Sequence, residues 1–476
     1  MPKQTIGPPF NPLALAKETQ VAVELLLLED QTKSQAQTSE PAAEFEAKRQ
    51  YSRLQSCYLS NRVRGLYGPL EAYRLAVKEW ALVSADKKHE HCQTLLAAVA
   101  NPMMLNISLE KLMPKLIRRD ADLELFLHDS SAKWNWLRGL QRDLTENRFR
   151  RGKYEKYKIA KPGNSGFRTI EVPNSEARIV ARTLASVLQP LVDPLFYPLS
   201  VGFRPGRSVL HGIAAAEQLL QRGLTHWVAC DIRDAFGQVP KQPLLDVLTS
   251  RLHGSSVMCL VREILDTHRK RGIPQGIAIS PLAMNVYLDH FLDRWWTERF
   301  PHTCLVRYAD DIMIACPSRQ LAIAAFEALE TRGTAIGMPI KETQTDAVLD
   351  LTKGDVVDWL GFRIRLCGDD MKVTLGTKSW ENLEFKLKEV QSRKCRGETY
   401  SREDIASIGF GRMLEKAIAF GEQQVPAAAV KIRDLANELN LDMSAFTNER
   451  AQSAWSVGQQ KWQEAREKVT DWLPLN

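Results

Sequence analysis

The most informative stretch of the chain is Leu305-Val306-Arg307-Tyr308-Ala309-Asp310-Asp311-Ile312-Met313-Ile314-Ala315-Cys316. Two short apolar runs flank a polar centre, and this pattern predicts two strands joined by a tight turn. Two adjacent carboxylates, Asp310 and Asp311, occupy the predicted turn. Because an unpaired charge is costly to bury, we expect a cationic group close to them.

A third carboxylate, Asp231, follows the apolar run Trp227-Val228-Ala229-Cys230, and we predict a strand over residues 225–230. A carboxylate at a strand end beside a turn with two more carboxylates is the arrangement that holds two divalent ions about 3.5–4 Å apart for phosphoryl transfer. Asp231, Asp310 and Asp311 are therefore the candidate metal ligands.

The residues around these stretches alternate apolar runs with helical patterns. We predict a long helix over residues 280–296 and another over residues 322–329. Apolar residues at helical spacing fill residues 42–150, and an amphipathic, charge-rich helical pattern returns from residue 378. The chain is therefore expected to be an α+β protein with helical segments toward both ends.

The composition is that of a folded globular protein. Of 476 residues, 44% are hydrophobic and 25% charged, which excludes collagen-like repeats and wholesale disorder. The net charge of +7 permits a polyanionic partner without requiring one. Eight scattered cysteines with no CxxC pair predict a reduced, cytoplasmic protein. The most apolar early run, residues 21–28, is interrupted by Glu24, so we expect no contact with a membrane.

The chain resembles a known family over roughly residues 161–362. Tyr308-Ala309-Asp310-Asp311 resembles the YxDD signature of reverse transcriptases, and other signatures of that family occur in the expected order. Any one of these blocks is weak evidence, whereas an ordered set is strong. The seven blocks are residues 168–173 with 178–180, 200–208, 231–236, 272–282, 308–311, 337–341 and 359–362.

The resemblance implies the fold of a polymerase right hand. A helical N-terminal extension (residues 1–150) would be followed by fingers (151–223), a palm with finger elements (224–370) and a helical thumb with the C-terminal segment (371–476). The palm would be built on a ferredoxin-like βαββαβ sheet.

The same resemblance implies an enzyme, an RNA-directed DNA polymerase that makes DNA from dNTPs with two Mg²⁺ ions. Asp231 and Asp310 would bridge the metal ions and lower the pKa of the primer 3′-hydroxyl, and Asp311 would support them. The implied partners are an RNA template, the DNA product and dNTPs.

Other residues of these blocks would bind the nucleotide. Arg168 and Arg178 would clamp the triphosphate, because guanidinium groups match phosphate oxygens. Lys341 would protonate the pyrophosphate leaving group. Phe236 would lie under the sugar and exclude a 2′-hydroxyl, which selects deoxynucleotides. The chain departs from group II intron enzymes at residues 237–238, which are Gly-Gln where those enzymes usually carry an aspartate.

Two further pairs of residues would contact the nucleic acid. Gln275 and Gly276 belong to a block that lines the nascent base pair, where a glycine allows close backbone approach to the template. Leu360 and Gly361 belong to the block that resembles the primer-grip hairpin.

Other polar groups are interpreted as structural. Asp369 and Asp370 imitate a GDD signature, but their alternating flanks predict an exposed hairpin turn. Asp289 and Asp293 lie four residues apart on a predicted helix and are expected on its solvated face. The stretch His89-Glu90-His91-Cys92 has no second ligand pair at zinc-site spacing, which favours a surface helix.

Among reverse transcriptases, the chain most resembles the stand-alone bacterial enzymes. The residues after the predicted thumb are too few for an RNase H domain together with an integrase, and the Cys/His pattern of a homing endonuclease is missing. Abortive-infection and defence-associated reverse transcriptases carry a helical extension, so we expect a role in bacterial antiphage defence.

The extension leaves alternatives open. It would hold a dedicated non-coding RNA, or supply a hydroxyl for protein-primed synthesis from Tyr51, Tyr58, Tyr67 or Tyr73. A template-independent DNA polymerase and a non-catalytic RNA-binding scaffold are the other hypotheses, and the oligomeric state is open. Retention of all three carboxylates argues against the scaffold, because buried carboxylates without a metal cost stability.

Overall fold

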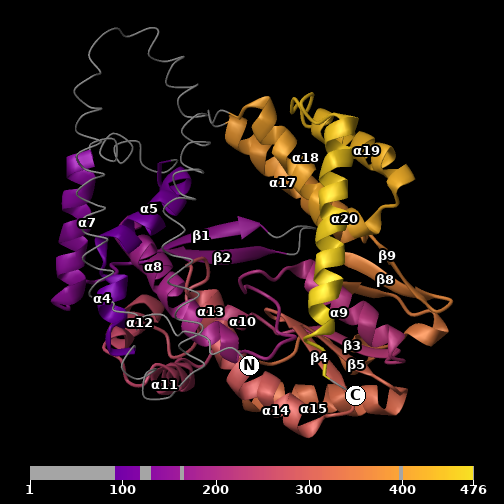
Figure 1. Ribbon diagram of the computed structural model, residues 1–476, viewed down its shortest axis with the longest axis horizontal. Coiled ribbons are helices and arrows are strands. Elements are labelled where there is room, and N and C mark those ends of the chain that lie inside the picture. The colour runs from indigo at the N-terminus through magenta and orange to yellow at the C-terminus, as the bar shows by residue number, and fades with distance from the viewer. Residues whose placement is uncertain (1–91, 118–129, 161–165, 396–399, 475–476) are drawn as a thin grey trace, which may run out of the picture. The chain divides into compact units, whose positions relative to one another are not determined.

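The structure is a computed structural model that describes residues 92–117, 130–160, 166–395 and 400–474 (Figure 1). The four candidate priming tyrosines lie outside the described residues, as do His89 to His91; Cys92 is described and is buried. The chain divides into two compact units. The first comprises the described residues up to 156 with 171–195 and 241–283, and the second comprises those of 157–170 with 196–240 and 284 onward.

The first unit is built around helix α8 (Ser175–Val192). The Asn174 side chain caps this helix by accepting a hydrogen bond of 2.8 Å from the backbone N–H of Ala177. Helices α4, α5 and α12 pack against α8, which buries most of its apolar side chains. The other helices of this unit are α4 (Leu95–Val99), α5 (Pro102–Ile117), α7 (Ser130–Thr145), α11 (Lys241–Arg251) and α12 (Val257–Leu265).

A two-stranded sheet, β1 (Glu155–Ala160) with β2 (Phe167–Val172), has residues in both units. Its strands carry basic and aromatic residues, which are Lys156, Tyr157 and Lys158 on β1 and Phe167 and Arg168 on β2. Phe167 is 68% exposed, which is unusual for a large apolar side chain.

The second unit contains a four-stranded sheet in the order β4-β5-β3-β6, and every neighbouring pair is antiparallel. Helix α15 (Arg319–Ala335) connects β5 to β6 and packs on the sheet. The succession of strand, helices, two strands, helix and strand is the ferredoxin-like arrangement, so this prediction is confirmed. The strands are β3 (His226–Asp231), β4 (Cys304–Tyr308), β5 (Asp311–Cys316) and β6 (Val348–Asp350).

The long helix predicted over residues 280–296 is present but interrupted. It comprises α13 (Ser280–Leu288), one π-helical turn (Asp289–Asp293) and α14 (Arg294–Arg299). The prediction that Asp289 and Asp293 lie on a solvated face is wrong, because both are fully buried. Asp289 accepts hydrogen bonds from the backbone of Tyr197 and from Arg294, and Asp293 pairs with Arg307. These partners compensate for the loss of hydration.

The C-terminal part begins with a three-stranded sheet of β7 (Val357–Trp359), β8 (Phe362–Cys367) and β9 (Asp370–Thr374). Asp369 and Asp370 are exposed at the β8–β9 turn, as predicted. Four helices follow and form a separate apolar core. They are α17 (Thr377–Cys395), α18 (Arg402–Glu415), α19 (Val425–Asn437) and α20 (Asn448–Thr470).

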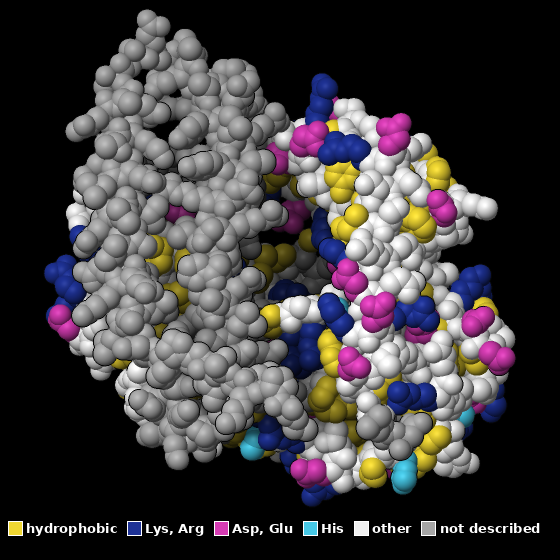
Figure 2. Space-filling view, viewed as in Figure 1, with side chains coloured by type: hydrophobic (Ala, Val, Ile, Leu, Met, Phe, Trp, Pro, Cys, Tyr) yellow, Lys and Arg dark blue, Asp and Glu magenta, His cyan; other side chains and the backbone are white. Residues whose placement is uncertain are grey.

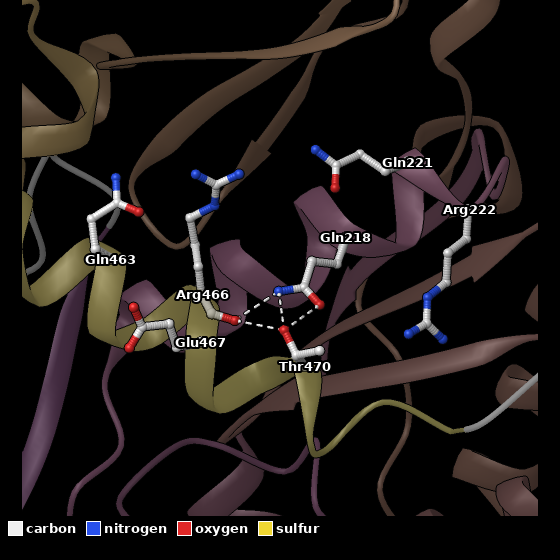
Figure 3. A pocket seen from close by; sticks show the side chains of 7 residues that line it. All are labelled: Gln218, Gln221, Arg222, Gln463, Arg466, Glu467 and Thr470. Carbon is white, nitrogen blue, oxygen red and sulfur yellow. Dashed lines mark hydrogen bonds between the residues drawn. The ribbon is translucent and has the colours of Figure 1, made fainter.

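Helix α20 returns the chain to the sheet and packs on α9 (Val209–Gln221). The Gln218 side-chain nitrogen donates hydrogen bonds to the carbonyl of Arg466 (2.8 Å) and the hydroxyl of Thr470 (3.2 Å), as Figure 3 shows. On the face seen in Figure 2, basic and acidic side chains are interspersed over the described surface. Of the helices in the described ranges, none has the length and apolar character that crossing a bilayer needs. The α+β class is confirmed.

Candidate active site

Asp231, Asp310 and Asp311 lie together at one end of the two central strands. Asp231 is the last residue of β3, Asp311 is the first residue of β5, and the two are cross-strand partners. Asp310 directly precedes Asp311, in the β4–β5 turn, and its carbonyl accepts a hydrogen bond of 3.1 Å from the backbone N–H of Ile232. The sheet register therefore gathers the three carboxylates that the sequence singles out.

The three carboxylates repel one another. The pKa of Asp311 is raised to about 9, first by burial and then by its hydrogen bond with Asp231 and by the neighbouring negative charges. Burial also raises the pKa of Asp310, and so does Asp231, whereas Arg168 and Arg307 act in the opposite direction. A divalent cation would relieve this repulsion, because it favours the charged form of each carboxylate.

Carboxylate oxygens are the ligands that Mg²⁺ prefers, so the donor set fits that ion. In the part of the chain that the structure describes, no three His, Cys, Asp or Glu side chains have metal-holding geometry as they stand.

The expected cation next to the carboxylates is Lys341. Its Nζ lies 3.4 Å from a carboxylate oxygen of Asp231, and its backbone N–H donates to the carbonyl of Asp231 at 2.9 Å. Burial alone would lower the pKa of Lys341, but Asp231 and Glu342 raise it, so the ammonium keeps its proton.

Glu342 also belongs to the site. In the sequence only its position directly after Lys341 indicates this. Its carboxylate accepts a hydrogen bond of 2.7 Å from the backbone N–H of Asp231 and lies 3.5 Å from the Lys341 ammonium. It also contributes to the raised pKa of Asp311. Glu342 therefore fixes the end of β3 and adds a fourth carboxyl group to the site.

Phe236 lies in the short helix α10 (Ala235–Gln238), which follows β3 directly, and it is half-buried. The preceding Asp234 has a left-handed backbone (φ 46°). A Cβ on Gly237 would lie 2.1 Å from the Asp234 carboxylate, so a larger residue at 237 would have to displace that side chain. The role of Phe236 in sugar selection stays a prediction.

Leu360 and Gly361 form the turn between β7 and β8. Both have positive φ values, 52° and 75°, which is typical of a tight hairpin turn. The Nζ of Lys416 donates to the Leu360 carbonyl at 3.1 Å and lies 4.0 Å from the centre of the Phe362 ring. Burial lowers the pKa of Lys416 to about 8.

A cavity of about 840 Å³ connects this turn with the carboxylates. Its lining includes Asp231, Asp311 and Lys341 on the sheet side and Arg412 and Lys416 on the helical side. Arg412 and Lys416 are only 8% and 5% exposed, and no sequence signature marks them. The lining of the cavity therefore includes both the site carboxylates and two buried cations.

The remaining predicted nucleotide-binding residues are on other elements. Arg168 is exposed on β2, in the second unit, whereas Arg178 on α8, Gln275 and Gly276 belong to the first unit. The Gln275 carbonyl accepts a hydrogen bond of 3.0 Å from the backbone N–H of Glu171, and Gly276 has a φ of 112°. Their contacts with nucleotide and template stay predictions.

Residues 159–364 match the family described as reverse transcriptase (RNA-dependent DNA polymerase). Protein YkfC of Escherichia coli (strain K12) is 31% identical over 150 residues, which are 29% of this chain and 39% of that protein. The group II intron-encoded protein LtrA of Lactococcus lactis subsp. cremoris is 26% identical over 147 residues, 29% of this chain and 24% of LtrA. A putative COX1/OXI3 intron 2 protein of Saccharomyces cerevisiae is 28% identical over 177 residues, 35% of this chain and 20% of that protein. The chain thus spans less than half the length of these relatives.

Two solved structures show a more distant likeness. A telomerase from Candida albicans, in complex with a fragment of telomeric RNA, has 14% sequence identity and a TM-score of 0.36, and the match covers 70% of this chain and 68% of that one. A partial Cas6-RT-Cas1–Cas2 complex has 21% identity and a TM-score of 0.31, covering 51% and 42%. Both likenesses are too weak to support an argument.

Proposed function

We propose that this chain, which contains a reverse transcriptase domain related to group II intron-encoded proteins, is an RNA-directed DNA polymerase that makes DNA from dNTPs. The observation that carries the proposal is the cross-strand pair of Asp231 and Asp311 with Asp310 in the adjoining turn. Three carboxylates at one end of a sheet can hold the divalent ions that phosphoryl transfer needs.

Two Mg²⁺ ions, when bound, would neutralise the triphosphate and lower the pKa of the primer hydroxyl. The carboxylates of Asp231, Asp310 and Asp311 would hold them. Lys341 lies beside Asp231 with its proton retained, so it is placed to donate that proton to the departing pyrophosphate. Phe236 lies in the short helix after β3. It would therefore contact the sugar of a nucleotide whose phosphates are bound near Asp231.

The template and the biological role are further parts of the proposal. The resemblance to stand-alone bacterial enzymes supports a dedicated non-coding RNA as the template and antiphage defence as the role. In the described ranges no two of the seven cysteines are joined by a disulfide, which supports a reducing compartment, the cytoplasm. The template-independent or protein-primed polymerase is the competing hypothesis.

The test is to purify the full chain with the nucleic acid it carries and to add labelled dNTPs and Mg²⁺, with and without RNase pretreatment. Asp310→Ala should abolish synthesis, and Asp369→Ala is the matched control, because Asp369 is an exposed turn carboxylate outside the site. RNase-sensitive synthesis that needs Asp310 supports an RNA-templated enzyme. Synthesis that survives RNase supports the untemplated alternative, and loss of synthesis in Asp369→Ala alone would show the site to be misassigned.

A further inference from the structure

Arg307 is a fully buried arginine on β4, three residues before Asp310. Its Nε and Nη2 donate to the two carboxylate oxygens of Asp293, at 2.8 Å and 2.5 Å. Asp293 is also fully buried, in the π-helical turn. This geometry is a bidentate ion pair, which fixes the plane of the guanidinium group.

The other N–H groups of the Arg307 guanidinium also donate hydrogen bonds. Nη1 donates to the side-chain oxygen of Asn285 (3.0 Å) and to the backbone carbonyl of Ala309 (2.9 Å), and Nη2 donates to the hydroxyl of Ser200 (2.8 Å). A guanidinium has five N–H donors, and here each one has an acceptor. The ion pair with Asp293 therefore aims one donor at the turn that carries the catalytic carboxylates.

That turn has an unfavourable backbone conformation. Ala309 has a φ of 61°, in the left-handed region, which costs a non-glycine residue about 1–2 kcal/mol. The hydrogen bond from Arg307 to the Ala309 carbonyl stabilises this conformation. Since Asp310 follows Ala309 directly, the orientation of that peptide sets the direction of the Asp310 side chain.

A second backbone segment supports the turn from the other side. The Cβ of any residue larger than glycine at position 202 would lie 2.3 Å from the backbone nitrogen of Ala309, so Gly202 and the turn are in close contact. The Asn285 Nδ2 donates to the Gly202 carbonyl at 2.8 Å. Asn285 therefore joins Arg307 to the segment against which the turn packs.

Stability alone does not explain this arrangement. A buried ion pair contributes little net stability relative to apolar side chains of similar volume, because its desolvation offsets its attraction. An ion pair that served only to neutralise Asp293 would need no donor on the Ala309 carbonyl. The hydrogen bond from Arg307 to the Ala309 carbonyl is explained if it serves to keep the β4–β5 turn in a fixed orientation.

We propose that Arg307 is a positioning residue for nucleotide transfer: anchored by Asp293 and Asn285, it holds the Ala309 peptide so that the Asp310 carboxylate faces the metal site. The inference rests on the proposed function. Loosening the network should lower turnover and weaken divalent-cation binding while leaving the apparent affinity for dNTPs unchanged, because Arg307 is fully buried and does not contact the nucleotide.

The test compares three variants of the full chain. Asn285→Ala removes the hydrogen bond from Arg307 to Asn285 and leaves the ion pair with Asp293. Arg307→Lys keeps the positive charge but removes the planar guanidinium group, which makes the bidentate contact with Asp293. Arg294→Gln is the matched control, because Arg294 pairs with Asp289 in the same π-helical turn, so the substitution changes a neighbouring ion pair and leaves the pair of Arg307 with Asp293 in place. For each variant we would measure melting temperature, kcat and KM for dNTPs, and Tb³⁺ binding by luminescence.

We expect kcat to fall by up to about 10²-fold in Asn285→Ala and Arg307→Lys, with the KM for dNTPs unchanged and Tb³⁺ binding weakened several-fold. Arg294→Gln should match the wild type in kcat, in KM for dNTPs and in Tb³⁺ binding, although its melting temperature should fall because the buried Asp289 carboxylate loses its cationic partner. If folded Asn285→Ala and Arg307→Lys bind Tb³⁺ as tightly as the wild type, or lose only affinity for dNTPs, the positioning role is wrong.

A fourth variant separates positioning from charge. Arg307→Met removes a positive charge near the carboxylates, so a purely electrostatic role predicts tighter Tb³⁺ binding, whereas positioning predicts weaker binding. Tb³⁺ binding can be measured whether or not the protein is catalytically active. If the wild-type chain makes no DNA, the proposed function fails, and the order of Tb³⁺ affinities still decides the positioning role.

Discussion

Asp231 and Asp311 occupy the same register position on the antiparallel strands β3 and β5, and their side chains share a hydrogen bond. Two carboxylates can share a hydrogen bond only if one of them holds a proton. The pKa of Asp311, raised to about 9, is consistent with that proton. Binding of a divalent cation would displace it, so the pair is less favourable without metal than with it.

Asp311→Asn should therefore stabilise the metal-free protein while abolishing synthesis. The raised pKa of Asp311 means that the folded chain takes up a proton there at neutral pH, which costs stability, whereas an asparagine can donate a hydrogen bond to Asp231 without taking up a proton. A gain of about 1 kcal/mol raises the melting temperature of a unit this size by about 2–4 °C. Melting curves in EDTA and in Mg²⁺ measure both effects. The wild type should gain stability from Mg²⁺ and the variant much less. A variant that melts below the wild type in EDTA would show that the proton shared by Asp231 and Asp311 costs the protein no stability.

Phe236→Ala should admit ribonucleotides. The half-buried ring belongs to α10, the short helix after β3 and Asp231, where its bulk would exclude a 2′-hydroxyl. Loss of a steric contact of this size changes selectivity by about 10- to 200-fold. The measurement is kcat/KM for dNTPs and the matching rNTPs, with Phe236→Tyr as a control that keeps the ring. Unchanged selectivity in Phe236→Ala would rule out this residue as the gate.

Gly202→Ala should reduce synthesis strongly. The added Cβ would lie 2.3 Å from the Ala309 nitrogen and 2.8 Å from the Tyr308 carbonyl carbon, so the turn carrying Asp310 must shift. Gly411→Ala is the control, because the Cβ of residue 411 meets no atom within 4 Å. Synthesis by the two variants, compared at equal folded fraction from circular dichroism, checks the prediction. Equal activities would show that the close contact is not needed.

His211 should make the protein less stable at acidic pH. Burial, and then the positive charges of Lys468 and Arg207, lower its pKa to about 4. Its Nδ1 accepts a hydrogen bond from the Ser208 backbone, and its ring stacks on Trp472. A depressed pKa means that the unfolded chain takes up the proton first, so stability is lost as the pH falls from about 6.5 toward 4.

The check for His211 is the slope of melting temperature against pH in that range. His211→Gln keeps a hydrogen-bond acceptor for Ser208 but does not titrate, so its slope should be shallower than that of the wild type. Parallel slopes would mean that other groups account for the acid sensitivity.

Much of the candidate site could be predicted from local patterns. The apolar runs on both sides of Asp310 and Asp311 predict β4, the turn and β5, and the apolar run before Asp231 predicts β3. The alternating residues around Asp369 and Asp370 predict an exposed hairpin turn, which the structure confirms. Each of these conclusions depends on residues that are neighbours in the chain, where side-chain direction follows directly from the strand period.

The buried charges could not be predicted in this way. Asp293 looks like a solvated helix residue until its partner is known, and that partner, Arg307, is 14 residues away on a strand. The contacts of Arg307 with Ser200 and of Glu342 with Asp231 span 107 and 111 residues. The strands, the turns and the three catalytic candidates are thus encoded locally. Which charges are buried, and what holds the turn, depends on helix packing and sheet register, because only these bring a distant donor to each acceptor.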